Sequence, residues 1–316
     1  MYDNAKMIYI KTLTPTHAGA GQTLQNVDMP IQRETNTNIP KIEGSSLKGS
    51  IKHSIYRKIK INEKDVNEED VNEEEKMLNK IFGNDNGDSA SRIGFTDAKL
   101  LFFPIKSTTE IYKLITCPYV LKRWVEDLEY CEKEDLNYIN FDSIKSISIS
   151  EGECISLNKG SQVLEEYIFE NNENNKNKIN EITEILKKFD IEISEIEKRI
   201  VILNDTDFID LVSMYTEIIT RNRIDPKKGV AENKGLFTEE YLPTETIMYF
   251  MALSSPDFFE KVDETSINPF DYLEKELDYV FHVGGYSTIG KGLVKRTKIT
   301  KTANKPDNSE NEDGGK

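Results

Sequence analysis

The stretch that decides the fold is MIYIKTLTPTHAGAGQ at residues 7–22, followed by IEGSSLKGSIKHSIYRKI at residues 42–59. Residues 7–13 are rich in β-branched and aromatic side chains and predict a strand. The small residues that follow it predict a loop. In the second segment a serine can cap a helix, and four apolar residues recur every four positions along one face: Leu47, Ile51, Ile55 and Ile59. The chain therefore begins with a strand, a loop and a helix.

Later segments repeat this alternation of strands and helices. Residues 92–105 (RIGFTDAKLLFFPI) and the alternating residues 143–150 predict strands, and residues 236–252 predict two strands joined by a turn. Residues 269–280 predict a helix with Pro269 at its start, and a glycine-rich turn then leads into a last, basic strand. This order predicts an α+β fold: a four-stranded antiparallel sheet with helices on one face, of the RNA-recognition or ferredoxin-like kind, with large insertions.

Two segments in the middle of the chain predict insertions. Residues 62–76 are acidic and almost free of large apolar side chains, which predicts an exposed loop. Apolar residues between positions 179 and 200 are spaced three and four apart, which predicts a long amphipathic helix or a helical hairpin on the body of the protein. We therefore expect one domain over residues 1–301, with its core at about 6–60, 92–120 and 236–300, an acidic and helical insertion at about 126–200, and a disordered tail at 302–316.

The charge is unevenly distributed. The 316 residues include 41 Lys and Arg and 56 Asp and Glu, a formal net charge of −15 at pH 7. That total alone disfavours binding to nucleic acid phosphates. Basic residues nevertheless outnumber acidic ones in residues 1–61, and no acidic residue lies between Phe281 and Lys305. Two basic ends therefore flank an acidic middle.

Composition also excludes several classes of protein. Cys117, Cys131 and Cys154 are far apart, which argues against a disulfide framework and for a reducing compartment. The three histidines are equally scattered, so no structural zinc site is expected. No apolar run is long enough for a signal peptide or a membrane span, and we expect a cytoplasmic protein without membrane contact.

The glycine-rich turn near the end is the first candidate site. Residues 285–291 (GYSTIGK) match most of a P-loop, but Gly292 stands where a Ser or Thr would bind magnesium, and a strand is predicted where a helix is required. A nucleoside triphosphatase is therefore not expected. Glycine spacing alone favours two interpretations equally: a loop whose amides contact RNA phosphates beside Lys291, or a tight turn without a ligand.

The predicted helix start is the second candidate. Ser45 and Ser46 bring hydroxyls and backbone donors to a helix N-terminus, which attracts anions. Lys48 and Lys52 lie one turn apart on the same face. From spacing alone, an ordinary capped surface helix is the better interpretation.

The loop at residues 17–34 is the third candidate, because it gathers His17, Asp28 and Arg33. RNA is cut when its 2′-OH attacks the adjacent phosphate, which needs a base or a metal-anchoring carboxylate and a cation on the phosphate. These residue types suit that task. A lone Asp in a loop is more often a turn former, however, so the residues alone favour a non-catalytic loop.

Together these segments resemble a known family. The succession HAGAGQ, NVDMPIQRE and IPKIEGSSLKGSIK, with FHVGGYSTIGKGLVK at residues 281–295, resembles the RAMP superfamily of RNA-binding subunits in CRISPR effector complexes. The stretches IGFTDAKLLFFPIKS, LITCPYVLKRW and LFTEEYLP resemble the Cmr-type backbone subunit of type III-B complexes. The resemblance covers most of residues 6–124 and 201–298, whereas residues 126–200 match nothing in it.

The resemblance implies a target-RNA endoribonuclease that is also a scaffold. Such subunits bind guide crRNA and line up as head-to-tail copies, with a large polymerase-like subunit, a small helical subunit and end-capping RAMP subunits as further partners. A protruding thumb interrupts the guide–target duplex. Target RNA is cut at these regular intervals by metal-dependent 2′-OH attack, with Mg²⁺ or Mn²⁺ bound only together with RNA. The basic ends would then form the guide-binding face, and the acidic middle would point away.

The family motifs also imply roles for single residues. Asp28 is implied as the residue needed for cutting and for metal binding, His17 as a helper, and Glu239 or, by preference, Glu240 as an assisting acid. Contacts with guide RNA are implied for Arg33, Ser45, Ser46, Lys48, Gly49, Lys52, Gly284, Gly285, Thr288, Gly290 and Lys291.

Two other hypotheses stay open. One is a non-catalytic RNA-binding scaffold of a type III complex, including the Csm-type complex of type III-A. The other is a guide-processing RNase that uses His17 or His53 without a metal. Normal cutting of target RNA by an Asp28 variant would favour the first, and cutting in the presence of a chelator would favour the second.

Overall fold

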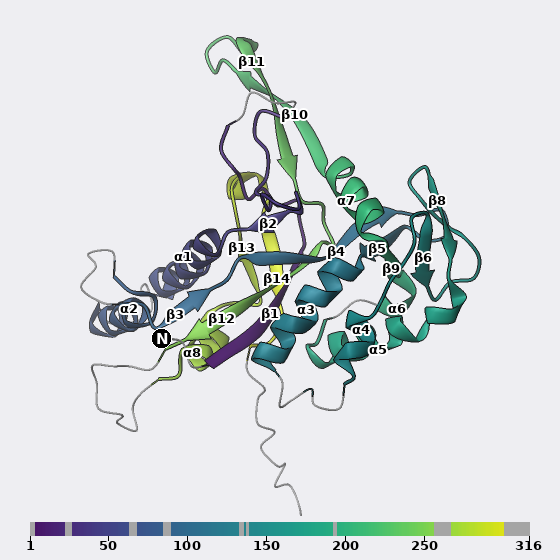
Figure 1. Ribbon diagram of the computed structural model, residues 1–316. Helices are drawn as coiled ribbons and strands as arrows, with labels where there is room; N and C mark the ends of the chain where they lie inside the picture. Colours follow the sequence, from purple (N-terminus) through teal and green to yellow (C-terminus); the bar gives the residue numbers. More distant parts are fainter. Residues whose placement is uncertain are drawn as a thin grey trace, which may run out of the picture.

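The protein is built around one large, mostly antiparallel sheet (Figure 1). The computed structural model describes residues 4–22, 27–62, 68–84, 90–132, 136, 139–191, 195–255 and 267–299. In the middle of the sheet the strand order is β14–β1–β12–β4. Along the chain, the core elements follow a β-α-β-β-α-β order: β1 (Asn4–Thr12), α1 (Gly44–Asn62), β4 (Ala98–Lys106), β12 (Ile247–Ser254), α8 (Pro269–Glu276) and β14 (Leu293–Arg296). The predicted α+β class with an antiparallel sheet is confirmed.

The side chains of β1 are buried on both faces of the sheet. Ile8 and Ile10 point to one face, and Tyr9 points to the other, because successive strand residues alternate. The indole N–H of Trp124, on α3 (Pro118–Cys131), donates to the hydroxyl of Tyr9 at 2.8 Å. Helix α3 is not one of the core elements named above. It therefore adds a helix to the face of the sheet on which Tyr9 lies.

Helix α1 buries its apolar stripe as predicted, since Leu47, Ile51, Ile55 and Ile59 are all buried. Its first turn is capped differently from the prediction. Oδ1 of Asp97, in the turn between β3 (Ile93–Phe95) and β4, accepts the amide of Gly44 at 2.9 Å. The predicted serine caps are therefore wrong, and a carboxylate from elsewhere in the chain satisfies this helix end.

The acidic stretch at residues 62–76 was predicted as a loop, and that prediction is wrong for its second part. Helix α2 spans Glu68–Phe82 and packs beside α1. Leu78 and Ile81, which lie just beyond the acidic run, are buried. Burial of these apolar side chains stabilises the helix, and Glu73 and Glu74 of the acidic run are exposed.

Two segments of the central region also differ from the prediction. Residues 143–150 form no strand; α4 (Phe141–Lys145) starts there because the side chain of Asn140 accepts the amide of Ser143. The apolar stripe from 179 to 200 is divided between α5 (Asn177–Lys188) and the short α6 (Ile196–Arg199). Of the two alternatives for that stripe, a single long helix is wrong. The predicted disordered tail at 302–316 lies outside the described residues.

The sheet continues beyond β4 through strands of the central region and ends beyond β14 at β13. The bounds of the remaining elements are β2 (Lys41–Ile42), β5 (Tyr112–Thr116), β6 (Glu153–Ser156), β7 (Gln162–Leu164), β8 (Tyr167–Asn171), η1 (Glu173–Asn175), β9 (Ile200–Leu203), β13 (Val280–His282) and η2 (Ser287–Ile289). The order after β4 is β5–β9–β6–β8–β7. Core and central region thus share one sheet, and their division into a domain and an insertion stays a prediction.

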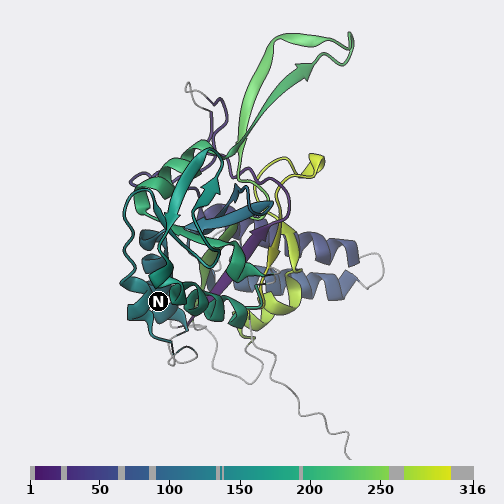
Figure 2. The same ribbon diagram turned by 90° about the vertical axis from the view of Figure 1, so that its right-hand side faces the viewer.

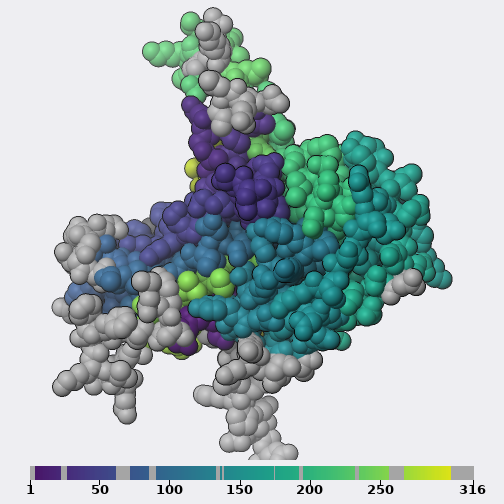
Figure 3. All heavy atoms as spheres, viewed as in Figure 1, coloured from purple at the N-terminus to yellow at the C-terminus, as the bar shows by residue number. Residues whose placement is uncertain are grey.

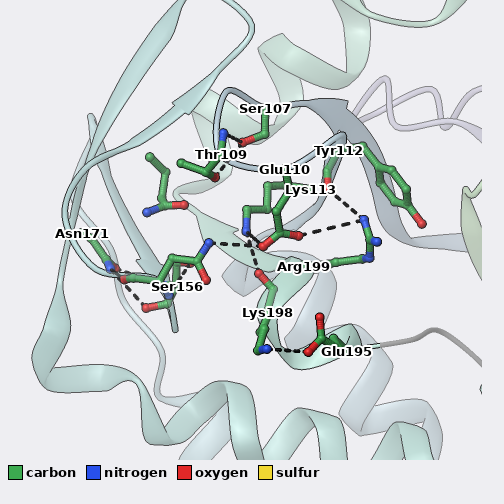
Figure 4. Close-up of polar contacts among 12 residues, drawn as sticks. Ser107, Thr109, Glu110, Tyr112, Lys113, Ser156, Asn171, Glu195, Lys198 and Arg199 are labelled. Atoms are coloured by element: carbon green, nitrogen blue, oxygen red, sulfur yellow. Dashed lines mark hydrogen bonds and ion pairs between the residues drawn. The ribbon is translucent and has the colours of Figure 1, made fainter.

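A buried ion pair holds the central strands together (Figure 4). Lys113 on β5 is fully buried, and its Nζ donates to Oε1 of Glu110 at 2.8 Å and to the carbonyl of Lys198 at 2.7 Å. The guanidinium of Arg199 lies 4.5 Å from the ring centre of Tyr112 and also faces Glu110. The members of this cluster satisfy one another, so we interpret it as a structural element.

A long hairpin projects from the body of the protein (Figure 2). It consists of β10 (Glu217–Ile224) and β11 (Ala231–Tyr241), which pair antiparallel and follow α7 (Asp205–Met214). We call this hairpin the thumb. Figure 3 shows the N-terminal part of the chain gathered at its foot. In the described part of the molecule, no helix combines the length and apolar character needed to cross a membrane.

The charges are arranged differently from the prediction. Basic residues near the two ends form ion pairs with acids of the intervening chain: Lys6 with Glu132 at 3.5 Å, Lys11 with Glu245 at 3.1 Å, Lys41 with Asp97 at 2.9 Å, and Arg296 with Glu274 at 2.9 Å. The expectation that the acidic middle points away from the basic ends is wrong for these acids. Fewer cations are left for RNA than the sequence suggests.

Candidate active site and RNA interface

The loop after β1 is fixed along β11 at the foot of the thumb. The amide of Met29 donates to the carbonyl of Thr238, and the amide of Glu240 donates to the carbonyl of Met29, both at 3.0 Å. On its other side the amide of Gln32 donates to the carbonyl of Ala18 at 2.8 Å. The described part of this loop is therefore an extended segment tied on both sides.

Asp28 lies on this segment with an exposed side chain. Its Oδ2 accepts the amide and the hydroxyl of Thr238 at 2.7 and 2.9 Å, and its own amide donates to that hydroxyl at 3.0 Å. The hydrogen bonds from Thr238, first from the amide and then from the hydroxyl, lower the pKa of the Asp28 carboxyl. The carboxylate is therefore ionised at neutral pH, and among the described residues its Oδ1 has no hydrogen-bond partner.

The imidazole of His17 is buried behind this segment, between the thumb and the glycine-rich turn. Its Nδ1 lies 2.7 Å from the carbonyl oxygen of Glu240. A carbonyl only accepts, so Nδ1 carries the proton and Nε2 is the acceptor of the neutral ring. The rings of Tyr241 and Tyr286 lie 5.5 and 5.2 Å from the imidazole. His17 therefore has one fixed tautomer but little contact with solvent.

Both carboxylate oxygens of Glu240 are engaged inside the protein. Oε1 lies 2.5 Å from Nη2 of Arg33 and accepts the hydroxyl of Thr216 at 2.8 Å, and Oε2 accepts the amide of Ile31 at 3.0 Å. Arg33 also donates to the carbonyl of Asn38 at 2.8 Å. These contacts favour an anchoring role for Arg33 and Glu240, in place of direct contact with RNA.

Glu239 points to the opposite face of β11 and has the less satisfied carboxylate. Its Oε2 accepts the hydroxyl of Tyr241 and pairs with Nε of Arg221 at 2.9 Å. Its Oε1 is buried, and the described residues give it no hydrogen bond. Burial and the nearby Glu239 carboxylate raise the pKa of Tyr286 to about 12, and the hydroxyl of Tyr286 donates to the sulfur of Met29 at 3.1 Å. This cluster joins the thumb, the glycine-rich turn and the segment that carries Asp28.

Several residues of this cluster are not predicted from the sequence: Thr238, Arg221, Tyr241 and Tyr286. The alternation of side chains along a strand was the available signal, since residues 239 and 241 must share one face of β11. No sequence signal indicated Tyr286, whose φ of 65° places a tyrosine in the left-handed region.

The glycine-rich turn closes on the backbone of His17. Gly284 has a φ of 82°, and a Cβ on it would lie 2.2 Å from the carbonyl oxygen of His17. The amide of Gly285 donates to that same oxygen at 2.9 Å, so it is not available to an RNA phosphate. Thr288 and Gly290 are exposed. Nζ of Lys291 lies 4.9 Å from the ring centre of Tyr241. Strand β14 follows this turn, which confirms that it is not a P-loop.

The residues at the start of α1 that were predicted to contact guide RNA divide into two groups. Ser45 and Gly49 are exposed, and at Gly49 no atom lies within 4 Å of an added Cβ. Nζ of Lys48 donates to the hydroxyl of Ser91 at 2.7 Å, and Nζ of Lys52 donates to the carbonyl of Gly83 at 3.0 Å. Both lysines therefore turn toward the segment between α2 and β3, away from the glycine-rich turn. Ser46 accepts a hydrogen bond from Gln32 at 3.3 Å.

The described residues fit a metal ion through Asp28 alone. They include no group of three or more His, Cys, Asp or Glu side chains that could hold a metal. In the described part of the chain, Asp28 offers one ionised oxygen without a hydrogen-bond partner, which is a ligand that Mg²⁺ accepts when water and RNA oxygens complete its shell. The arrangement fits an ion that binds jointly with RNA.

The chain resembles known proteins over most of its length. A family model described as the RAMP superfamily matches residues 9–295. The chain belongs to the RAMP superfamily. This RAMP protein is 35% identical, over 93% of its length and 95% of the relative's, to the CRISPR system Cmr endoribonuclease Cmr4 of Pyrococcus furiosus. It is 27% identical to the CRISPR system CMR subunit Cmr4 of Saccharolobus solfataricus, over 93% of its length and 96% of the relative's.

Solved structures give the same family. The crystal structure of oligomeric Cmr4 from Pyrococcus furiosus aligns with a TM-score of 0.68 and 29% identity, covering 94% of this RAMP protein and 99% of that chain. A type III-B Cmr-beta complex in the apo state aligns with a TM-score of 0.70 over 93% of this chain and 97% of that chain, at 23% identity, which supports the fold alone. The predicted resemblance to the Cmr-type subunit is confirmed.

Proposed function

We propose that this protein is a guide-RNA-binding backbone subunit of a type III-B CRISPR complex and that it cleaves complementary target RNA. One observation carries the proposal. The carboxylate of Asp28 is exposed, ionised and held in one orientation by Thr238, at the foot of a projecting hairpin. The relative from Pyrococcus furiosus is named an endoribonuclease, which supports the same activity in this chain.

The lowered pKa of Asp28 bears on its role. A general base works best when its pKa is near the operating pH, so a carboxylate with a lowered pKa is a weak base. It is, however, a good ligand for a hard cation. We therefore assign Asp28 to holding a divalent ion through Oδ1 while Thr238 orients it through Oδ2. When bound, such an ion neutralises the phosphate charge and acidifies the attacking 2′-OH.

Other residues of the cluster are assigned to positioning. In the reaction the 2′-oxygen forms a bond to phosphorus and the 5′-oxygen leaves, which requires an in-line geometry at the phosphate. The thumb is the element that could impose that geometry, since Ile218 and Leu236 on its surface are exposed apolar side chains. Glu239, the other acid that the resemblance implies, suits the role of assisting acid better than Glu240, because no described residue donates a hydrogen bond to its buried Oε1.

The partners follow from the same proposal. Guide crRNA and target RNA would lie across the foot of the thumb, and further copies of this chain would continue the backbone, as the oligomeric relative suggests. The large polymerase-like, small helical and end-capping subunits remain predicted partners. The single-domain division and the residue roles are likewise proposals.

The test uses a complex reconstituted with guide RNA. Asp28→Asn keeps the size of the side chain but removes its charge, and we expect normal guide binding with target cutting reduced by at least about 100-fold. Asp210→Asn is the control, because it removes an exposed carboxylate from α7. If Asp28→Asn and the control cut equally, Asp28 is not the residue that cuts, and a scaffold in a complex that cuts elsewhere is favoured. If chelator abolishes cutting, the metal-free RNase hypothesis is rejected.

A further inference from the structure

A hollow of about 440 Å³ separates α1 from β13 and the glycine-rich turn. One wall is the face of α1 that carries Ser50, His53, Ser54 and Arg57. The opposite wall includes His282 and Gly284. Its volume is within the range of small-ligand pockets, and no family motif assigns His53, Arg57 or His282 to any role.

The hollow carries uncompensated positive charge at Arg57. Lys58 also lines it, but its Nζ is paired with Asp278 at 3.2 Å and donates to the carbonyl of Glu276 at 3.1 Å. Arg57 is exposed, and the described residues offer it no hydrogen bond or ion pair. A guanidinium with all five N–H groups available is suited to a phosphate, which it contacts through two parallel hydrogen bonds.

His282 supplies the complementary chemistry. Its Nδ1 lies 3.2 Å from the carbonyl oxygen of Lys291, and since a carbonyl only accepts, Nδ1 carries the proton. Nε2 of the neutral ring is then an acceptor. A phosphodiester has no hydrogen to donate, whereas a ribose 2′-OH does, and that hydroxyl distinguishes RNA from DNA.

We propose that this hollow binds one ribonucleotide of the guide strand, with the phosphate on Arg57 and His53 and the 2′-OH on Nε2 of His282. The inference rests on the proposed function, because it assumes that guide RNA crosses this face. In this proposal the main phosphate contact on α1 lies on a different face of the helix from the contacts that the family motif implied. Lys48 and Lys52, which the motif implied, donate instead to Ser91 and Gly83.

The first experiment measures binding of single-stranded guide RNA to the full-length chain at several salt concentrations. Arg57→Ala should weaken binding about tenfold and lower the slope of log K against log salt by about 0.7, as expected for one lost phosphate contact on a single strand. Lys60→Ala is the matched control. It removes a cation from the same helix, but that ammonium pairs with Glu75 at 2.5 Å and does not line the hollow.

The second experiment tests the 2′-OH contact. His282→Asn retains a donor for the carbonyl of Lys291 but has no acceptor at the position of Nε2. The unmodified protein should prefer an RNA guide over its 2′-deoxy counterpart, and His282→Asn should reduce that preference by about fivefold, a loss of about 1 kcal/mol. Melting curves of both variants show whether the fold is intact.

The outcomes separate this inference from the proposed function. If folded Arg57→Ala and Lys60→Ala bind RNA equally, or if His282→Asn keeps the full preference, the hollow is not a guide site, while cutting that depends on Asp28 still stands. If Arg57→Ala weakens guide binding but Asp28→Asn cuts normally, the hollow is a guide site on a subunit whose Asp28 is not the cutting residue.

Discussion

Thr238 donates both its amide and its hydroxyl to a single oxygen of Asp28, at 2.7 and 2.9 Å, and the other carboxylate oxygen has no hydrogen-bond partner among the residues that the structure describes. The two residues are 210 positions apart in the sequence. The carboxylate that we propose as the metal ligand is thus oriented by a strand of the thumb, so that thumb position and carboxylate orientation are coupled.

Thr238→Val should reduce target cutting by about 10- to 100-fold without weakening guide binding, because partners that orient a metal-binding carboxylate contribute at that level. It should also raise the pKa of Asp28, since the Thr238 hydroxyl is one of the groups that lower it. Titration of the carboxyl carbon by NMR measures that shift. Thr220, which faces Thr238 across the hairpin, provides Thr220→Val as the control; equal cutting by the two variants would contradict this coupling.

Arg33→Met should destabilise the protein by about 3–5 kcal/mol, because it leaves the buried carboxylate of Glu240 without its cation. The double variant Arg33→Met/Glu240→Leu should recover much of that loss, since both charges are then gone. Urea denaturation measures both free energies of unfolding. If the double variant loses as much free energy of unfolding as the two single substitutions together, the two side chains contribute independently.

Gly284→Ala should lower the melting temperature and weaken guide binding, because its Cβ would overlap the carbonyl of His17. Gly290→Ala is the matched control: its φ of 76° is equally strained, but an added Cβ there meets open space. The control should cost only about 1–2 kcal/mol, the ordinary strain of a left-handed residue. Similar melting temperatures for the two variants would mean that strain alone, and not the contact with His17, matters.

Glu110→Ala should destabilise the central strands by about 3–5 kcal/mol at pH 7, because it leaves the ammonium of Lys113 buried and unpaired. Burial alone would raise the pKa of Glu110, but the hydrogen bond and charge of Lys113 outweigh it and the pKa is lowered. The ion pair therefore stabilises the protein above the usual pKa of Glu, about 4.3, and its contribution is lost as the pH falls below that value.

Urea denaturation at pH 7 and pH 4 should accordingly show a smaller difference between this variant and the unmodified protein at the lower pH. Guide binding and target cutting should persist wherever Glu110→Ala remains folded, because the cluster is not part of the proposed site. Loss of cutting by the folded variant would contradict its structural role.

Much of the fold could be predicted from periodicity. The four-residue spacing of Leu47, Ile51, Ile55 and Ile59 predicted the buried face of α1, because a helix repeats every 3.6 residues. The same rule failed at residues 62–76, because the apolar side chains through which α2 packs against the protein come after the acidic run. It also failed at residues 143–150, where a capping Asn starts a helix inside an alternating pattern.

The candidate site was less predictable, because partners distant in sequence decide the direction of each side chain. Spacing placed Lys48 and Lys52 on an exposed helix face, but hydrogen bonds to Ser91 and Gly83 direct both elsewhere. The resemblance favoured Glu240, yet Arg33, Thr216 and Ile31 occupy its oxygens. Asp28 needed the family motif, since a loop Asp has no chemical signature of its own.

The pairing of β1 has a consequence for biosynthesis. This first strand is hydrogen-bonded to β12 and β14, and the amide of Tyr9 donates to the hydroxyl of Thr297, 288 positions later. Such long-range contacts form slowly and only after the intervening chain has been made. A ribosome-bound chain therefore cannot complete the sheet beside the proposed RNA site until β14 has been translated.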